Sequence, residues 1–126
     1  MRNRHQESRT QAACVRWFRY QYPEYAQMLI AVPNGVATSE SQGAILKAEG
    51  MLAGVADLLL LLPTDTATLL AVEMKTDTGR QSPRQKEWQS EAEAHGIRYE
   101  VVRSFDEFKE LLTEYINQHE RRNQRN

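Results

Sequence analysis

The sequence predicts an α/β domain built on one mixed β-sheet, and the pattern of apolar residues is the main reason. Segments in which apolar residues recur with a period near 3.6 alternate with short runs rich in leucine, isoleucine and valine. Two of these runs, VADLLLLL at 55–62 and TLLAVEMK at 68–75, are largely apolar on both faces, which is typical of strands covered by helices on both sides. We therefore expect the order helix, strand, helix, two hairpin strands, helix, strand, helix.

The first third of the chain predicts a helix and a short strand. Over 7–22 apolar side chains fall at helical spacing, and Pro23 then ends the helix. The run MLIAV at 28–32 is rich in strand-forming residues, and the turn pair Asn34-Gly35 follows it.

The middle of the chain predicts a second helix and a β-hairpin. Ser39 or Ser41 can cap a helix that runs through SQGAILKAE, and Gly50 suits its C-terminal end. The apolar runs at 55–62 and 68–75 are joined by the short segment PTDTA. Because the connection is short, we expect the two strands to be antiparallel.

A capping box predicts the third helix. Ser82 is followed at once by a proline and three residues later by Gln85, so a helix is expected over 82–95, with Gly96 just beyond its end.

The last part of the chain predicts a strand and a final helix. The segment 97–103 alternates as a strand does, and Ser104 with Glu107 makes a second capping box for a helix over 105–119. We expect residues 121–126 to form a polar, solvated tail.

Composition limits the class of protein. The chain of 126 residues is most simply one domain, placed at 1–120. A net charge of -1 excludes a uniformly basic surface but allows a local basic face. The single cysteine, Cys14, excludes intrachain disulfides and a zinc site built on thiolates. No apolar run reaches the roughly 18–20 residues of a membrane span, and no signal-peptide pattern is present. We expect a soluble intracellular protein without a membrane partner.

Charged residues at the ends of the two apolar runs are the candidate site. Glu73 and Lys75 lie two residues apart in a strand, so they project to one face while Met74 projects to the other. An antiparallel hairpin would bring Asp57 to the same sheet edge. Two carboxylates, with the main-chain carbonyl of Met74, suit Mg²⁺ or Mn²⁺, and such a metal supports phosphodiester hydrolysis.

A structural ion pair at the end of the sheet is the alternative explanation of these charges. Nearby cations favour the explanation of these charges as a functional site, because the following segment carries cations that suit contacts with a phosphate backbone: Arg80, Arg84 and Lys86.

Three motifs together resemble a known nuclease family. Gly54-Val55-Ala56-Asp57, the strand end VEMK and the segment SPRQKEW resemble the VRR-NUC branch of the PD-(D/E)xK nuclease superfamily. The resemblance covers nearly the whole chain and departs from the superfamily name at Ala56, where the name has proline.

The resemblance implies a restriction-endonuclease-like core and a divalent-metal-dependent nuclease, using Mg²⁺ or Mn²⁺ and acting on DNA. It further implies a structure-specific endonuclease for branched DNA such as four-way junctions, working as a homodimer in the cytoplasm of a bacterial or phage-infected host cell. A non-catalytic nucleic-acid-binding module on the same fold is the alternative, and a sequence-specific nuclease is a third interpretation.

The resemblance also implies roles for individual residues. Asp57 and Glu73 match the metal ligands and Lys75 the catalytic lysine. Gln85 matches a glutamine that faces the site, although it is equally well explained as half of a capping box. Glu7 matches an acidic residue that reaches the metal cluster, although a first-turn glutamate is also favoured by the helix dipole.

The first helix carries several arginines. Arg9 and Arg16, together with Arg2, Arg4 and Arg19, form either a solvated face or a surface that holds DNA phosphates near the metal. We take Arg9 and Arg16 as DNA-binding residues.

The remaining conspicuous side chains are expected to be structural. Cys14 and the aromatic residues Trp17, Phe18 and Trp88 are most simply core residues. The histidines show no ligand spacing and are expected on the surface: His5, His95 and His119.

Overall fold

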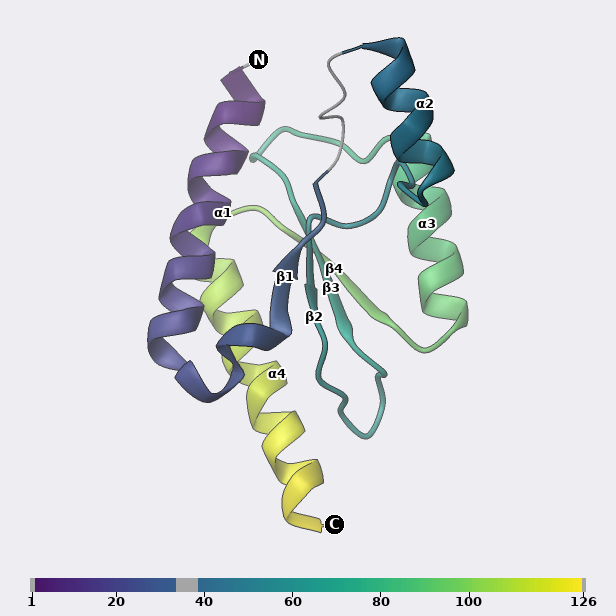
Figure 1. Ribbon diagram of the computed structural model, residues 1–126. Coiled ribbons are helices and arrows are strands. Elements are labelled where there is room, and N and C mark those ends of the chain that lie inside the picture. The colour runs from purple at the N-terminus through teal and green to yellow at the C-terminus, as the bar shows by residue number, and fades with distance from the viewer. Residues whose placement is uncertain (1, 34–38, 126) are drawn as a thin grey trace.

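The computed structural model describes residues 2–33 and 39–125 and confirms the mixed α/β class. The turn pair Asn34-Gly35 lies outside the described residues. None of the helices within the described ranges is both long and apolar enough to cross a bilayer. The elements follow the chain as shown in Figure 1: α1 (Arg2–Gln21), the 3₁₀ helix η1 (Pro23–Met28), β1 (Leu29–Ala31), α2 (Glu40–Ala48), β2 (Leu58–Leu60), β3 (Leu70–Met74), α3 (Pro83–Ala94), β4 (Arg98–Val102) and α4 (Phe105–Arg125).

The sheet has the strand order β1-β2-β3-β4. β1 pairs with β2 and β2 with β3 in antiparallel fashion, so the predicted hairpin is confirmed. β3 and β4 are parallel, which is possible because α3 carries the chain back between them. The hairpin register pairs Leu58 with Val72, and this register determines which side chains meet at the end of the sheet.

Helices lie on both faces of the sheet (Figure 1). α1 packs against α4 on one face, and α3 packs against β4 on the other. The face under α1 and α4 holds the larger apolar cluster, which includes Phe18, Phe108 and Tyr115. Full burial of a large apolar side chain contributes about 1.5–3 kcal/mol, so this face supplies most of the hydrophobic stabilisation. Cys14 and Phe18 are buried there, as expected.

Capping groups fix where the helices begin and end. The side chain of Ser39 accepts a hydrogen bond from the amide of Gln42, which makes Ser39 the cap of α2. The predicted capping box of Ser82 is present at the start of α3. Gly50 and Gly96 follow α2 and α3 with φ of +112° and +83°, a region that glycine adopts without strain.

Both terminal helices are longer than the sequence pattern predicts. α1 begins at Arg2, and α4 continues to Arg125, so residues 121–125 are helical instead of an irregular tail. Arg125 pairs with Asp65 of the hairpin loop, and cations in a last helical turn interact favourably with the helix dipole. These interactions have no counterpart in the apolar periodicity, which fades after His119.

The expectation that His119 lies on the surface is wrong. Its side chain is buried, and its Nδ1 lies 2.6 Å from the carbonyl oxygen of Pro63. Since a carbonyl can only accept, Nδ1 donates this hydrogen bond. His119 therefore ties α4 to the hairpin, while His5 and His95 are exposed, as expected.

Candidate functional site

The hairpin brings the two expected carboxylates together. Leu58 pairs with Val72, and one step further along the same antiparallel register Asp57 stands opposite Glu73. Opposite residues of an antiparallel pair share a face of the sheet, so the two side chains are neighbours. The sequence prediction that both acids meet at one end of the sheet is confirmed, although β2 itself is shorter than the expected strand at 55–62.

Glu73 is a buried carboxylate whose two oxygens both have partners. Its side chain is only 2% exposed. Oε2 accepts a hydrogen bond of 2.8 Å from Nε2 of Gln85, and Oε1 accepts one of 3.3 Å from the hydroxyl of Tyr99. Lys75 Nζ lies 3.8 Å from Oε2, which is within ion-pair range but beyond a good hydrogen bond. The orientation of the carboxylate is therefore fixed by neutral donors.

Burial and a like charge both act on the pKa of Glu73. Desolvation is the larger cause, the neighbouring Asp57 adds to it, and together they raise the pKa of Glu73 to about 8 despite the opposing effect of Lys75. The single positive charge of Lys75 therefore does not offset the cost of ionising Glu73 in this buried position.

Asp57 is held by the main chain of the neighbouring strands. Its Oδ2 accepts a hydrogen bond of 2.7 Å from the amide of Met74, and its carbonyl accepts one of 2.9 Å from the amide of Val32. The side chain of Met74 is buried in the core on the other face. The side chain of Met74 is therefore not available as a ligand, and only its main chain is.

Gln85 performs both of the roles that the sequence left open. Its Oε1 accepts a hydrogen bond of 2.8 Å from the amide of Ser82, which completes the capping box, and its Nε2 donates to Glu73. The two roles do not exclude each other, because the two ends of a carboxamide offer an acceptor and a donor at once. Gln85 links the start of α3 to the buried acid.

Tyr99 and Gln81 belong to the site but were missed by sequence reasoning. Nε2 of Gln81 donates hydrogen bonds to the hydroxyl of Tyr99 at 3.2 Å and to Gln89 at 2.9 Å. Burial, followed by the charge of Glu73, raises the pKa of Tyr99, so its hydroxyl stays protonated as a donor. The only signal in the sequence is the alternation in 97–103; it places Tyr99 on a face but does not reveal which strand lies next to β4.

Arg103 was also missed, and it organises the segment after Lys75. Its Nη1 donates hydrogen bonds of 2.7 Å to the carbonyl oxygens of Thr76 and Gly79. Because Arg103 follows β4 directly, it anchors the exit of β3 to the exit of its parallel neighbour. No local pattern in the sequence predicts this contact.

Gly54 allows α3 to approach the site closely. Its φ is +91°, and a Cβ atom at this position would lie 2.8 Å from the carbonyl oxygen of Arg84. Any side chain there would push the first turn of α3 away. The glycine of the G-x-x-D motif therefore holds Gln85 within reach of Glu73.

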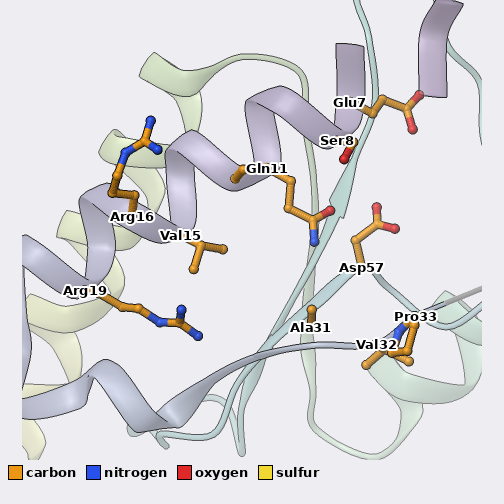
Figure 2. A pocket seen from close by; sticks show the side chains of 11 residues that line it. Glu7, Ser8, Gln11, Val15, Arg16, Arg19, Ala31, Val32, Pro33 and Asp57 are labelled. Atoms are coloured by element: carbon orange, nitrogen blue, oxygen red, sulfur yellow. The ribbon is translucent and has the colours of Figure 1, made fainter. Parts of the chain in front are cut away.

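A cleft of about 770 Å³ adjoins Asp57, between α1 and the β1 edge of the sheet. Figure 2 shows Glu7 and Asp57 at one end of this cleft, with the amide of Gln11 directed into the space beside them. Arg16 and Arg19 line it further along α1. Glu7 thus lines the same cleft as Asp57, whereas Arg9 is exposed and does not line it. That Glu7 reaches a metal there stays a prediction.

The cations expected after β3 are exposed around the start of α3. Arg80 lies in the loop, and Arg84 and Lys86 lie in the first turn of the helix. Within the part of the chain that the structure describes, none of them forms an ion pair with a carboxylate, and none lines the cleft. Their guanidinium and ammonium groups remain open to solvent.

The donor set fits a hard divalent cation. Across residues 2–33 and 39–125, no three acidic, histidine or cysteine side chains converge as a complete cage. Asp57 and Glu73, with the Met74 carbonyl, supply a partial oxygen set, and Mg²⁺ and Mn²⁺ commonly complete such sets with water and phosphate oxygens. Lys75 places one positive charge beside them, 3.8 Å from Glu73.

Comparisons with known proteins identify the family. The family model of the VRR-NUC domain matches residues 2–106 of this chain. A solved structure described as "VRR_NUC domain protein" superposes with a TM-score of 0.77 at 21% sequence identity, covering 89% of this chain and 88% of that chain. At this identity the likeness establishes the fold, and no curated protein matches the chain. Because the match runs from α1 through β4, the chain belongs to the VRR-NUC domain family, whose domains are of nuclease type.

Proposed function

We propose that this protein is a divalent-metal-dependent DNA endonuclease that acts on branched DNA such as four-way junctions. One observation carries the proposal: Asp57 and Glu73 stand opposite each other at the end of β2 and β3, with Lys75 3.8 Å from Glu73. Two adjacent carboxylates with a single nearby ammonium form an arrangement that a divalent cation neutralises.

The residues divide the work of hydrolysis between them. Asp57, Glu73 and the Met74 carbonyl would hold Mg²⁺ or Mn²⁺, which when bound lowers the pKa of water and stabilises negative charge on a phosphate. Lys75 lies beside Glu73 and can orient the attacking water or contact the scissile phosphate. Gln85 and Tyr99 fix the orientation of Glu73. Hydrolysis adds water across one P–O ester bond, and the departing oxygen takes a proton.

We propose the substrate and the assembly on the basis of the charges around the same site. Exposed cations at Arg80, Arg84 and Lys86, with Arg16 in the cleft, supply contacts for the phosphates on both sides of the carboxylates. One active site cuts one strand, so cutting a four-way junction in two places needs two copies. We therefore propose a homodimer whose two-fold symmetry matches that of the junction.

Cleavage of a labelled DNA panel tests the proposal. Four-way junction, 5′ flap, duplex and single strand are incubated with Mg²⁺, Mn²⁺ or EDTA, using wild type, Glu73→Ala, Lys75→Met and the control Glu110→Ala on the exposed face of α4. We expect metal-dependent cutting by wild type and by the control, and loss of cutting in the other two variants. A Glu73→Ala protein that cuts at the wild-type rate would refute the ligand assignment. Band shifts in EDTA without cutting under any metal would instead favour a non-catalytic binding module.

A further inference from the structure

We propose that the cleft along α1 holds an unpaired DNA strand, gripped at its far end by Arg16, Arg19 and Tyr20. This inference deepens the proposed function, on which it rests, because it specifies which part of a branched substrate the protein binds. The observations that carry it are the spacing of residues along α1, two arginines without acidic partners and one exposed aromatic ring.

A continuous stripe of α1 faces the cleft. The lining residues of α1 come in adjacent pairs four residues apart, Glu7 with Ser8, Gln11 with Ala12, and Val15 with Arg16, and Arg19 begins the next pair. Residues four apart lie one above the other on a helix, so Tyr20 lies one turn beyond Arg16, just past the residues that line the cleft. The cleft therefore has acidic residues at one end and two arginines at the other, and Tyr20 follows one helical turn beyond Arg16.

The cationic end lacks a partner within the protein. Among residues 2–33 and 39–125, neither Arg16 nor Arg19 forms an ion pair. Figure 2 shows the guanidinium of Arg19 extending across the space between α1 and the segment that leads into β1. Guanidinium groups one turn apart, left unpaired at a cleft, are suited to neighbouring phosphates of one strand.

Tyr20 supplies a surface for a base. It is 86% exposed, the most exposed large apolar side chain in the described part of the chain. Sites for single strands combine cations along the path of the backbone with aromatic rings, since every base can stack on a ring, and Arg16 and Arg19 supply the cations here. The walls of the cleft add apolar area through Ala12, Val15 and Val32. A duplex hides the faces of its bases and would leave this apolar surface unused, so an unpaired strand is the better fit.

The geometry sets a minimum length for the unpaired strand. From Glu7 to Tyr20 the helix rises about 20 Å, at about 1.5 Å per residue. At about 3.4 Å per stacked nucleotide, a strand needs about six unpaired nucleotides to extend from the carboxylates to Tyr20. Shorter arms reach the site but not the aromatic ring.

Binding in EDTA tests this inference separately from catalysis. Fluorescence anisotropy would measure the Kd of the full chain for a DNA hairpin with a 5′ or 3′ thymidine arm of 2 or 10 nucleotides, and for the blunt hairpin. The proteins are wild type, Tyr20→Ala, Arg19→Ala and the control Arg121→Ala, an exposed arginine of α4 outside the cleft.

We expect Tyr20→Ala to raise the Kd for a 10-nucleotide arm about tenfold, and to leave the 2-nucleotide and blunt hairpins unchanged. Arg19→Ala should lower the slope of log Kd against log salt by about 0.7, the value for one phosphate of a single strand. The control should match wild type.

Equal effects of Tyr20→Ala on long arms and blunt hairpins would overturn the inference, as would wild-type binding by both cleft variants. A change in sedimentation of Tyr20→Ala without DNA would also overturn it, because the ring would then belong to a protein contact. Failure of the nuclease proposal looks different: arm-dependent binding would persist while the cleavage panel showed no cutting with any metal.

Discussion

The two faces of the sheet use the same strands for different purposes. On the face under α1 and α4, Leu58, Val72 and Met74 pack into a continuous apolar cluster. Along the strands they alternate with residues whose side chains lie on the opposite face of the sheet. On the face under α3, the apolar cluster is small, and Glu73 with Tyr99 occupies the centre of a hydrogen-bonded network. One strand, β3, therefore contributes to the core with one set of side chains and to the site with the other.

The difference shows where stability and chemistry reside in this domain. The α1/α4 face can lose little apolar volume without losing the fold, whereas the α3 face carries a carboxylate that is unfavourable for the metal-free protein. Separate effects on stability and on metal binding should therefore follow from substitutions on the two faces.

The largest effect is expected from Phe108→Ala on the α1/α4 face. Phe108 is fully buried and packs edge-on against Trp17 at 6.2 Å between ring centroids. Its truncation leaves a cavity and should lower the free energy of unfolding by about 3–5 kcal/mol. Urea denaturation followed by circular dichroism measures this loss, and a cost below about 1.5 kcal/mol would contradict the assignment of this face as the main core.

Gly54→Ala should disrupt the close packing of the first turn of α3 against the segment before β2. The added Cβ would clash with the carbonyl of Arg84 at a φ that side chains rarely adopt, so we expect a loss of about 2 kcal/mol or more. Gly50→Ala is the matched control, since its φ is also positive but nothing lies within 4 Å of the added atom. Equal losses in urea denaturation would mean that backbone conformation, and not the approach of α3, explains the glycine.

Removing one tyrosine hydroxyl from each face distinguishes the role of that face in metal binding from its role in stability. Tyr99→Phe deletes a donor to Glu73 and should weaken Mn²⁺ binding about tenfold in calorimetry. Tyr115→Phe deletes the hydrogen bond to the carbonyl of Leu62 in the main core, so it should lower stability without changing metal affinity. Equal metal affinities in the two variants would remove Tyr99 from the site.

The last effect concerns the pH dependence of the metal-free protein. An unfolded glutamate has a pKa of about 4.3, whereas burial and Asp57 raise that of folded Glu73 to about 8. As pH rises between these values, the unfolded chain loses a proton that the folded chain retains, so Glu73 makes the folded state progressively less stable.

Glu73→Gln removes this ionisation and should raise the melting temperature in EDTA much more at pH 8.5 than at pH 5. Glu110→Gln on the surface of α4 is the control and should melt like wild type at both pH values. A melting difference between Glu73→Gln and wild type that is independent of pH would show that packing, and not ionisation, is responsible.

The sequence predicted those features that depend on local patterns. Apolar runs marked β2 and β3, the capping boxes marked the helix starts, and the hairpin placed Asp57 near Glu73. Local patterns in the sequence did not predict contacts between distant segments. Tyr99 meets Glu73 because β4 lies parallel to β3, and Arg103 reaches the loop after β3 for the same reason. The buried position of His119 depends on the loop carbonyl of Pro63, which no pattern around the histidine indicates.

The dual role of Gln85 has a consequence for dynamics. The same carboxamide closes the first turn of α3 and orients Glu73, so fraying of that turn releases the acid in the same event. Hydrogen exchange at the amide of Ser82, whose hydrogen bond ends on Gln85, should therefore report how often Glu73 loses its fixed orientation. Solvent conditions that accelerate this exchange should weaken metal binding to a matching extent.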